Sequence, residues 1–378
     1  MNKIEELIQQ LCPNGVEYKD LGEVLDYEQP TKYIVESTRY HKDHETPVLT
    51  AGQTFILGYT DETEGIYEAS KENPVIIFDD FTTSFHWVDF EFKVKSSAMK
   101  MLRPKKGCDI IFRFIFYAMK CVEYNPQDHA RQWISVYSKF QIPVPPLPIQ
   151  QEIVKILDSF TQLEAELEAE LEARRKQYEY YRDSLLSYDE NSNEVEWKTL
   201  GEVCLSISAG GDLPENYVKG QKYPTEDLPY PIYSNGTENN ALYGYTDGFK
   251  IDRDAITISA RGTIGYHTIR KAKFTPIVRL ITLIPNDILI KSGFLNYILY
   301  ITPIGGNGGS IPQLTVPNVK KILIPVPPLS EQERIVGILD KFDALVNDIS
   351  VGLPAEIAAR RKQYEYYRGK LLTFRKAN

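Results

Sequence analysis

Apolar residues recur in alternating steps of four and three along two long stretches of the sequence. The first stretch places them at Ile149, Ile153, Ile156, Phe160, Leu163 and Leu167, and the second at Ile335, Ile338, Phe342, Leu345 and Ile349. This spacing is typical of a coiled-coil seam. At about 1.5 Å per residue, residues 149–188 would form a rod of about 60 Å. Gly352-Leu353-Pro354 interrupts the second stretch, so the second rod should kink or restart there.

The two predicted rods have three candidate packing partners. Two such helices in one chain pack most simply against each other, antiparallel and within one molecule. The alternatives are that each rod packs on its own globular module, or pairs with a second copy of the chain. The helix predicted at Ile4–Leu11 precedes Val16 just as Tyr181–Leu186 precede Val195. We therefore expect the front of the chain to supply the end of the second rod.

Outside the rods, the pattern changes to short apolar runs separated by Gly, Asn, Asp and Ser. The runs read as β-strands at residues 74–78, 90–94, 255–259 and 276–285. One amphipathic helix follows in each half, at residues 110–124 and 293–301. The predicted fold class is therefore α+β, with two mixed α and β modules separated by two long helices.

An internal repeat organises the chain. Ala173–Arg182 recurs, identical at ten positions, as Ala359–Arg368. Two further blocks repeat: Ile142–Leu147 in Ile324–Leu329, and Val16–Val24, at seven of nine positions, in Val195–Val203. The module interiors between these blocks are nearly unrelated. Repeated ends with different interiors suggest one kind of partner for the ends and two different targets for the interiors. The alternative is an old duplication that drifted.

The repeat also predicts the domain boundaries. A first module occupies residues 1–147, including the N-terminal helix at residues 3–11, and a first long spacer helix follows at 148–190. A second module then occupies residues 191–329, and a second long spacer helix occupies 330–378. We expect the whole to form a pseudo-twofold arrangement.

Net charge at first opposes a nucleic-acid partner, because the chain carries a formal charge of −9. The acid is unevenly placed: residues 151–190 hold 11 acidic and 5 basic groups, whereas residues 191–378 hold 19 acidic and 22 basic groups. The segments 93–106 and 255–285 contain basic residues and no acidic ones. Such segments suit contacts with phosphates. The alternative is that they are ordinary solvated strands.

Several classes of protein are disfavoured by what the sequence lacks. It has no run of 18 apolar residues, and its start carries acid where a signal peptide needs a basic and then an apolar stretch. Its four cysteines form no CxxC pair and no plausible zinc spacing. We therefore expect a cytoplasmic chain with no membrane segment, no disulfide framework and no metal.

Catalytic signatures are weak. There is no GxxxxGK[ST] phosphate loop, no GxGxxG after a strand and no Asn/Asp-Pro-Pro-aromatic motif of an amino-methyltransferase. Asp80, Glu91 and Lys93 mimic the acidic triad of some nucleases, but these residue types are common on surface strands. We expect no catalytic residues, and keep the nuclease as an unfavoured alternative.

With its duplicated layout, the chain resembles the specificity subunits of type I restriction–modification systems. The resemblance rests on the repeated Ile-Pro-Val-Pro-Pro-Leu blocks with the helices that follow them, at residues 142–158 and 324–340. It rests also on the paired Arg-Arg-Lys-Gln-Tyr-Glu-Tyr-Tyr-Arg helices, on Phe78–Thr83 and on Ser259–Gly265. The likeness extends over the whole chain.

The resemblance implies a division of labour. Two target recognition domains would each read one half of a bipartite, gapped site in double-stranded DNA. The two helices would set the gap and dock two methyltransferase subunits, which would hold S-adenosylmethionine and flip the adenine. Motor-nuclease subunits could join that complex. This chain would bind no cofactor and catalyse nothing itself. A structural coiled-coil adaptor that reads no DNA is the alternative.

Candidate DNA-binding residues are polar and basic residues in loops beside the strands, or basic residues of the 93–106 segment. In the first module they are Lys32, Tyr33, Gln53, Thr82, Thr83, Lys93, Lys95, Arg131 and Gln132. In the second they are Ser234, Asn235, Asn239, Arg261, Thr263, Asn307 and Gln313. Candidate partner-binding residues are Tyr180, Tyr181, Tyr366 and Tyr367, for which packing in the helix seam is the alternative.

Overall fold

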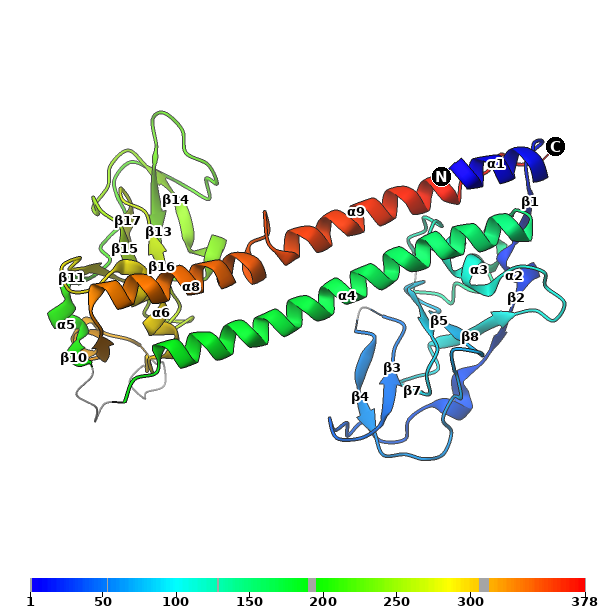
Figure 1. Ribbon diagram of the computed structural model, residues 1–378, viewed down its shortest axis with the longest axis horizontal. Coiled ribbons are helices and arrows are strands. Elements are labelled where there is room, and N and C mark those ends of the chain that lie inside the picture. The colour runs from blue at the N-terminus through cyan, green and yellow to red at the C-terminus, as the bar shows by residue number, and fades with distance from the viewer. Residues whose placement is uncertain (1, 53, 128, 190–194, 306–312, 378) are drawn as a thin grey trace. The chain divides into compact units, whose positions relative to one another are not determined.

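A computed structural model of the chain describes residues 2–52, 54–127, 129–189, 195–305 and 313–377. It divides into two compact units (Figure 1). Unit 1 comprises residues 1–167 and 357–378, and unit 2 comprises residues 168–356. Over the described ranges, no helix is both long enough and apolar enough to cross a membrane.

Unit 1 is built from short strands and helices around the start of one long helix and the end of another. Its helices are α1 (Asn2–Leu11), α2 (Leu21–Val24), α3 (Phe112–Met119), the first half of α4 (Leu147–Leu186) and most of α9 (Leu353–Leu371), with 3₁₀ turns η1 (Pro30–Tyr33) and η2 (Tyr137–Lys139). Its strands are β1 (Glu17–Asp20), β2 (Leu25–Glu28), β3 (Thr46–Leu49), β4 (Ile56–Thr60), β5 (Val75–Asp79), β6 (Phe85–Val88), β7 (Lys93–Val94), β8 (Met99–Pro104) and β9 (Gln141–Val144).

The described part of unit 2 follows a similar order of elements, with one additional strand and differently placed 3₁₀ turns. Its helices, after the second half of α4, are α5 (Leu200–Val203), α6 (Ser292–Ile301), α7 (Val316–Lys320) and α8 (Leu329–Asn347), with the 3₁₀ turn η3 (Glu238–Ala241). Its strands are β10 (Glu196–Thr199), β11 (Cys204–Ala209), β12 (Tyr217–Lys219), β13 (Tyr230–Tyr233), β14 (Leu242–Thr246), β15 (Ala255–Ser259), β16 (His267–Arg270), β17 (Thr275–Pro276), β18 (Leu280–Pro285) and β19 (Leu323–Val326).

The main sheets of the two units have the same topology. Strands run in the order β2-β8-β5-β6 in unit 1 and β11-β18-β15-β16 in unit 2, with every neighbouring pair antiparallel. A smaller sheet accompanies each, in the order β4-β3-β7 and β12-β14-β13-β17. The mixed α and β modules expected from the sequence are therefore confirmed.

Strand β5 explains why the predicted runs are continuously apolar instead of alternating. Ile76 and Phe78 face a core shared with α3, whereas Val75 and Ile77 face a second core that contains Leu49 of β3. All four β5 side chains are fully buried. A strand covered on both faces loses the polar alternation of a half-exposed strand.

The repeated blocks form the ends of each module, and they pair with each other. Strand β1 pairs with β9 from Glu17 opposite Val144, and β10 pairs with β19 in the matching register. The Leu-Gly-Glu-Val helices that follow β1 and β10 begin with capping boxes, in which Glu23 and Glu202 accept the backbone N–H of Asp20 and Thr199 at 2.8 Å. The same sequence blocks therefore build the same closure in both units.

Helices pair antiparallel inside each unit. In unit 1, Phe160 of α4 stacks on Tyr367 of α9 at 5.6 Å, and Glu164 of α4 pairs with Arg361 of α9 at 2.5 Å. Residue numbers rise along α4 and fall along α9 between these two contacts, so the helices are antiparallel. In unit 2, Tyr181 of α4 stacks on Phe342 of α8 at 5.5 Å. The second rod is interrupted between α8 and α9, around the Gly352-Leu353-Pro354 sequence.

The first turns of the rods differ from the predicted seam. Ile149, Ile153 and Leu157 of α4 are buried in the core of their own module, where the sequence pattern favoured Ile156 over Leu157. Unit 2 repeats this with Ile335 and Leu339. Each rod therefore packs first on its module and only then on the other rod. Ile349, another predicted seam residue, is 85% exposed beyond the end of α8.

The two ends of the chain meet in unit 1. Figure 1 shows α1 beyond the C-terminal end of α9, which agrees with the expectation that the front of the chain continues the second rod. Ile4 is buried with Leu371 and Leu372, and Lys3 forms an ion pair with Glu152 of α4. The backbone N–H of Val16 donates to the carbonyl of Arg375 at 2.9 Å.

Candidate functional site

Each main sheet ends in a tight turn that is built by the same backbone hydrogen bonds. In unit 1 the turn follows β5: Asp80 N–H donates to Ala98 O, and Asp80 O accepts from Gln132 N–H. In unit 2 the turn follows β15: Ala260 N–H donates to Arg279 O, and Ala260 O accepts from Leu314 N–H. We call residues 79–84 and 259–266 the strand-end turns. They place residues far apart in sequence at one edge of each module.

A buried carboxylate organises the turn of unit 1. Asp80 has no exposed surface, and its Oδ1 accepts the backbone N–H of Trp133 at 2.8 Å. Its Oδ2 lies 3.1 Å from Nζ of Lys100, which is also buried, and 3.5 Å from the guanidinium of Arg131. The neighbouring Asp79 carboxylate accepts the backbone N–H groups of Phe81 and Thr82, so two carboxylates and two cations meet at this edge of the module.

Arg131 is the solvent-facing member of this network. Half of its side-chain surface is exposed, and the guanidinium lies 5.9 Å from the ring centre of Phe81. That ring stacks on the imidazole of His129 at 4.7 Å. Thr82 is exposed at the tip of the same turn. Four of the described candidates, Thr82, Thr83, Arg131 and Gln132, thus lie together around Asp80.

The turn of unit 2 uses different side chains. Asn235 donates from Nδ2 to the carbonyl of Arg261 at 2.9 Å, and Ser259 Oγ accepts the backbone N–H of Gly236 at 3.1 Å. Arg261 is half-buried, and Thr263 and Gln313 are exposed. Ser234, Asn235 and Arg261 are therefore brought together, and the residue that corresponds to buried Asp80 is Ala260.

Three predicted DNA-binding residues have polar groups that are buried and hydrogen-bonded inside the chain. Lys93 pairs with Glu62 at 2.9 Å and donates to the Glu64 carbonyl. Thr83, at φ 60°, donates from its hydroxyl to the Thr82 carbonyl at 2.7 Å. Gln132 accepts from the Tyr124 hydroxyl at 2.7 Å and donates to the Ala130 carbonyl at 2.9 Å. Using them on DNA would break these bonds without replacement.

Lys32, Tyr33 and Lys95 form a separate group. Lys32 is exposed, and its hydrogen bond to Glu28 at 2.9 Å, with the charge of that carboxylate, raises the pKa of Lys32. Tyr33 shares the same carboxylate and packs edge-on against Tyr67 at 4.7 Å. Lys95 is exposed. These residues stay candidates for phosphate contacts.

Gln53 and Asn307 lie outside the described residues. Asn239 lies in η3, but its side chain is outside the description.

Phe81, His129 and Lys100 were missed by sequence reasoning. Phe81 lies inside the Phe78–Thr83 motif, and Lys100 lies inside the basic 93–106 segment, so the sequence contained a pattern that could have identified both. His129 lacked one, because only the fold brings it onto Phe81.

The three residues of the nuclease alternative do not form an open acidic site in the structure. An acidic nuclease site needs open carboxylates that can hold a divalent cation. Asp80 is instead buried and neutralised by Lys100, Lys93 is committed to Glu62, and Glu91 is exposed on the surface. Within the described ranges, no group of three or more His, Cys, Asp or Glu side chains could hold a metal ion.

Each module is attached to its long helix by a repeated set of polar contacts. Gln150 of α4 accepts the Ile111 N–H at 2.9 Å and donates to the Pro145 carbonyl at 2.7 Å. In unit 2, Gln332 of α8 accepts the Lys291 N–H at 2.8 Å and donates to the Pro327 carbonyl at 2.8 Å. Both glutamines are buried, so they fix the modules on the helices with satisfied polar groups.

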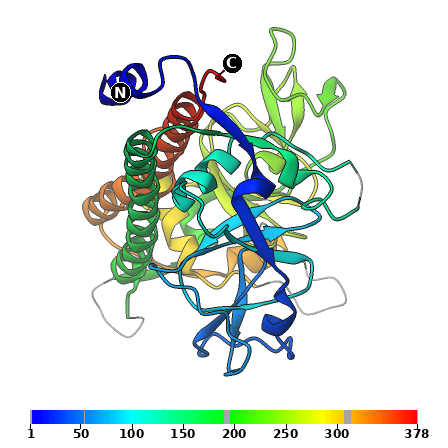
Figure 2. The ribbon, with the colours of Figure 1, turned by 90° about the vertical axis from the view of Figure 1, so that its right-hand side faces the viewer.

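A buried tyrosine makes the second repeated contact. The Tyr117 hydroxyl donates to Asp158 at 2.5 Å, and the Tyr297 hydroxyl donates to Asp340 at 2.7 Å. Burial, with the neighbouring carboxylate, raises the pKa of both phenols well above the usual range, so they stay protonated donors. Figures 1 and 2 both show α3, which carries Tyr117, beside α4.

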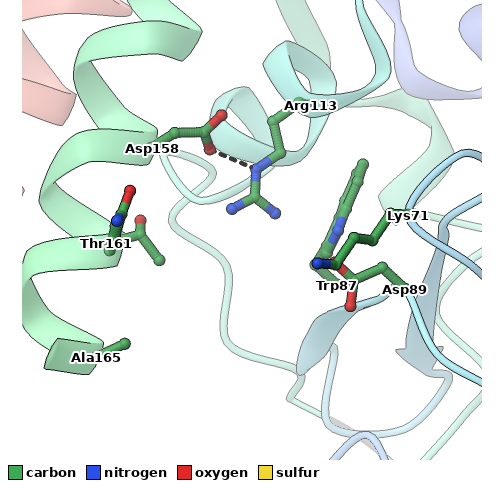
Figure 3. A pocket seen from close by; sticks show the side chains of 8 residues that line it. Lys71, Trp87, Asp89, Arg113, Asp158, Thr161 and Ala165 are labelled. Atoms are coloured by element: carbon green, nitrogen blue, oxygen red, sulfur yellow. Dashed lines mark hydrogen bonds and ion pairs between the residues drawn. The ribbon is translucent and has the colours of Figure 1, made fainter.

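A hollow of about 510 Å³ opens beside this contact in unit 1 (Figure 3). Arg113 pairs with Asp158 at 2.8 Å and lies 4.7 Å from the ring centre of Trp87. Lys71 and Asp89 line the outer side. The arginine is thus held between the helix and the sheet, which braces the module against α4.

The four candidate partner-binding tyrosines divide into two kinds. Tyr181 stacks on Phe342, and Tyr367 stacks on Phe160. One ring face of each tyrosine is therefore used in helix pairing, as the alternative of packing in the helix seam predicted. Tyr180 and Tyr366 are 69% and 63% exposed. Because they occupy the same place in the repeated ten-residue block, they offer two equivalent exposed aromatic positions.

Comparison with known sequences gives one consistent result. The family described as "Type I restriction modification DNA specificity domain" matches twice, at residues 13–173 and 193–359. A type I restriction enzyme specificity subunit of Escherichia coli is 43% identical over 394 aligned positions, covering 96% of this chain and 95% of the relative. A putative specificity subunit of Haemophilus influenzae is 32% identical and covers 95% of this chain and 96% of the relative.

Solved structures agree at the level of the fold. The type I restriction–modification S subunit from M. genitalium superposes with a TM-score of 0.57 at 18% identity, covering 95% of this chain and 96% of that one. A chain from a study of assembly and conformational transition in a type I R-M system gives a TM-score of 0.55, also at 18% identity, and covers 96% of this chain and 98% of that one.

Proposed function

Because the chain belongs to the family of type I restriction–modification DNA specificity subunits, we propose that it reads a bipartite DNA site, one half with each module. The observation that carries this proposal is the pair of strand-end turns. Both turns have the same backbone construction, yet they carry different side chains. One scaffold with two sets of side chains is the arrangement needed to recognise two different short sequences separated by a gap.

The proposed reading uses both kinds of DNA contact. Exposed Lys32 and Lys95 suit phosphates, which set the position of a module on the duplex. Thr82, Arg131, Arg261, Thr263 and Gln313 suit base edges in a groove. The buried Asp80 and Lys100 hold the first turn in shape and need not touch DNA. Asn235 does the same for the second turn through the Arg261 carbonyl.

The proposed partners are methyltransferase subunits. We assign them to the long helices, where the identical blocks Ala173–Arg182 and Ala359–Arg368 present Tyr180 and Tyr366 in equivalent, exposed positions. Two equal blocks suit two copies of one partner. S-adenosylmethionine and the chemistry would belong to those partners, and this chain would be a non-catalytic subunit that acts in the cytoplasm. Motor-nuclease subunits would join for restriction.

Base-resolution sequencing of methylated DNA tests the proposal. Cells with and without the gene should differ by methylation at one bipartite motif, with two short specified parts and an unspecified gap. Footprinting of the complex reconstituted with the methyltransferase should protect the same two parts. A single continuous palindromic motif would contradict the proposal. A reconstituted complex that binds no DNA would favour the structural adaptor.

A further inference from the structure

One position in each module has the same place in the fold and a different side chain. Arg131 and Gln313 each lie ten residues before the strand that closes the module, which begins at Gln141 in β9 and at Leu323 in β19. Each is followed by a residue whose backbone N–H bonds the strand-end turn. Gln132 donates to the carbonyl of Asp80, just after β5, at 2.7 Å, and Leu314 donates to the carbonyl of Ala260, just after β15, at 2.9 Å. Chain position and hydrogen bonding therefore agree that Arg131 and Gln313 are equivalent.

Both side chains are available at the surface beside their turns. Half of the Arg131 side chain is exposed, and its 3.5 Å contact with Asp80 uses one of the five N–H donors of the guanidinium. Gln313 is exposed. The main chain at both positions is tied to the sheet by the neighbouring hydrogen bond, so each side chain starts from a fixed point.

The two side chains suit different bases. In the major groove, the forked guanidinium of arginine pairs with O6 and N7 of guanine, and the amide of glutamine pairs with N6 and N7 of adenine. Thr82 and Thr263, exposed on the two turns, add hydroxyls that suit several bases. The network around Asp80 anchors Arg131, because Oδ2 of that carboxylate contacts both buried Lys100 and one guanidinium nitrogen, while half of the Arg131 side chain stays exposed.

We infer that residues 131 and 313 are equivalent specificity-determining positions, with Arg131 reading a guanine in one half-site and Gln313 reading an adenine in the other. This inference rests on the proposed DNA-reading function and adds the residues and bases to it. It predicts that exchanging the two side chains exchanges the preference at one base pair of each half-site and leaves the remaining motif unchanged.

The test uses the full chain reconstituted with its methyltransferase partner. The variants are Arg131→Gln, Gln313→Arg and the double exchange, and the matched control is Arg39→Gln, which removes the same charge from an exposed arginine of the first module. Methylation of a randomised DNA library is sequenced, and binding to matched and single-mismatch duplexes is measured. Arg131→Gln should lower the preference for guanine at one position by roughly 5- to 150-fold and favour adenine there. Gln313→Arg should do the reverse in the other half-site.

The possible results distinguish failure of the inference from failure of the proposed DNA-reading function. A change at one base pair per variant, with the gap, the other half-site and the Arg39→Gln control unaltered, supports the inference. Weaker binding to all sequences alike, with an unchanged motif, would show that Arg131 contacts phosphate and would overturn it. Both variants acting on the same half-site would overturn the equivalence. If the unmodified complex selects no bipartite motif, the proposed function fails, and the inference fails with it.

Discussion

Among single residues, the two units place different side chains at the same buried positions of the main sheet and its turn. The cross-strand register places Lys100 opposite Phe78 in unit 1 and Ile281 opposite Ile258 in unit 2. The buried pair Asp80–Lys100 of unit 1 therefore corresponds to Ala260 and Ile281 of unit 2. A buried ion pair and an apolar pair are interchangeable in a fold only if both members change together, since one charge left alone in the interior is costly.

This correspondence predicts a double-substitution result. Asp80→Ala alone should destabilise unit 1 by about 3–5 kcal/mol, because Lys100 stays buried without its carboxylate. The double variant Asp80→Ala/Lys100→Ile, which copies unit 2, should be more stable than either single variant. Denaturant unfolding of the four proteins gives the coupling free energy. Additive losses would mean that the two charges do not depend on each other.

His267 of unit 2 corresponds in register to Phe85 of unit 1, so a titratable ring replaces an apolar one. His267 is buried, its ring nitrogens face the carbonyls of Gly265 and Asn296, and burial lowers its pKa although both carbonyls favour the protonated ring. The unfolded chain therefore takes up the proton first as the pH falls. The stability that neutral His267 contributes is complete above about pH 6.5 and is lost as the pH falls below that value.

Replacement by the residue of the other unit tests this dependence. The melting temperature of unit 2 should fall more between about pH 7.5 and about pH 5.5 in the unmodified chain than in His267→Phe, which cannot titrate. Phe85→Leu in unit 1 serves as a control that changes a core ring without changing protonation. Equal pH dependence in the unmodified chain and His267→Phe would contradict the assignment.

At the scale of the elements, the attachment of modules to helices depends on a few repeated polar groups. Gln150 and Gln332 satisfy the backbone N–H at the residue just before α3 and α6, and they also reach a proline carbonyl at the base of the helix. Apolar packing by Ile153 and Leu157 supplies contact area, whereas the glutamines fix position along the helix.

Removing one glutamine should therefore loosen one module and not the other. Gln150→Leu has a similar volume but leaves the Ile111 N–H and the Pro145 carbonyl without partners, at a cost of about 1–3 kcal/mol for each group. Hydrogen exchange should accelerate in α3, and in α6 for Gln332→Leu. The exposed Gln162→Leu on the same helix is the matched control. Faster exchange in both modules from one substitution would show that the attachments are not independent.

At the scale of the whole molecule, the proposed function gives the helices the task of setting the gap between half-sites. Residues 163–166 and 167–170 have the same sequence, Leu-Glu-Ala-Glu, so deleting residues 167–170 of α4 leaves its local pattern intact. The deletion shortens a helix by about 6 Å. This length approaches two base-pair steps of about 3.4 Å each.

The deletion variant should recognise both half-sites unchanged with a shorter gap. Methylome sequencing of cells that carry the deletion measures this directly. A control substitution of Leu-Glu-Ala-Glu by Ala-Glu-Ala-Glu at residues 167–170 keeps the length and should keep the gap. A changed half-site with an unchanged gap would contradict the role of the helices as a spacer.

The repeat, the two long helices, their interruption near Gly352, and the division between similar ends and dissimilar interiors are all predictable from the amino-acid pattern alone. These features are local or periodic, so they can be read without knowing which segments meet. Which polar residues face solvent depends instead on the folded arrangement of the chain. Lys93, Thr83 and Gln132 are surface candidates by sequence, yet contacts with residues between 1 and 31 positions away satisfy their polar groups in the interior. Asp80, Lys100 and Arg131 meet only because β5, β8 and the segment before η2 converge, and such long-range convergence leaves no periodic trace in the sequence.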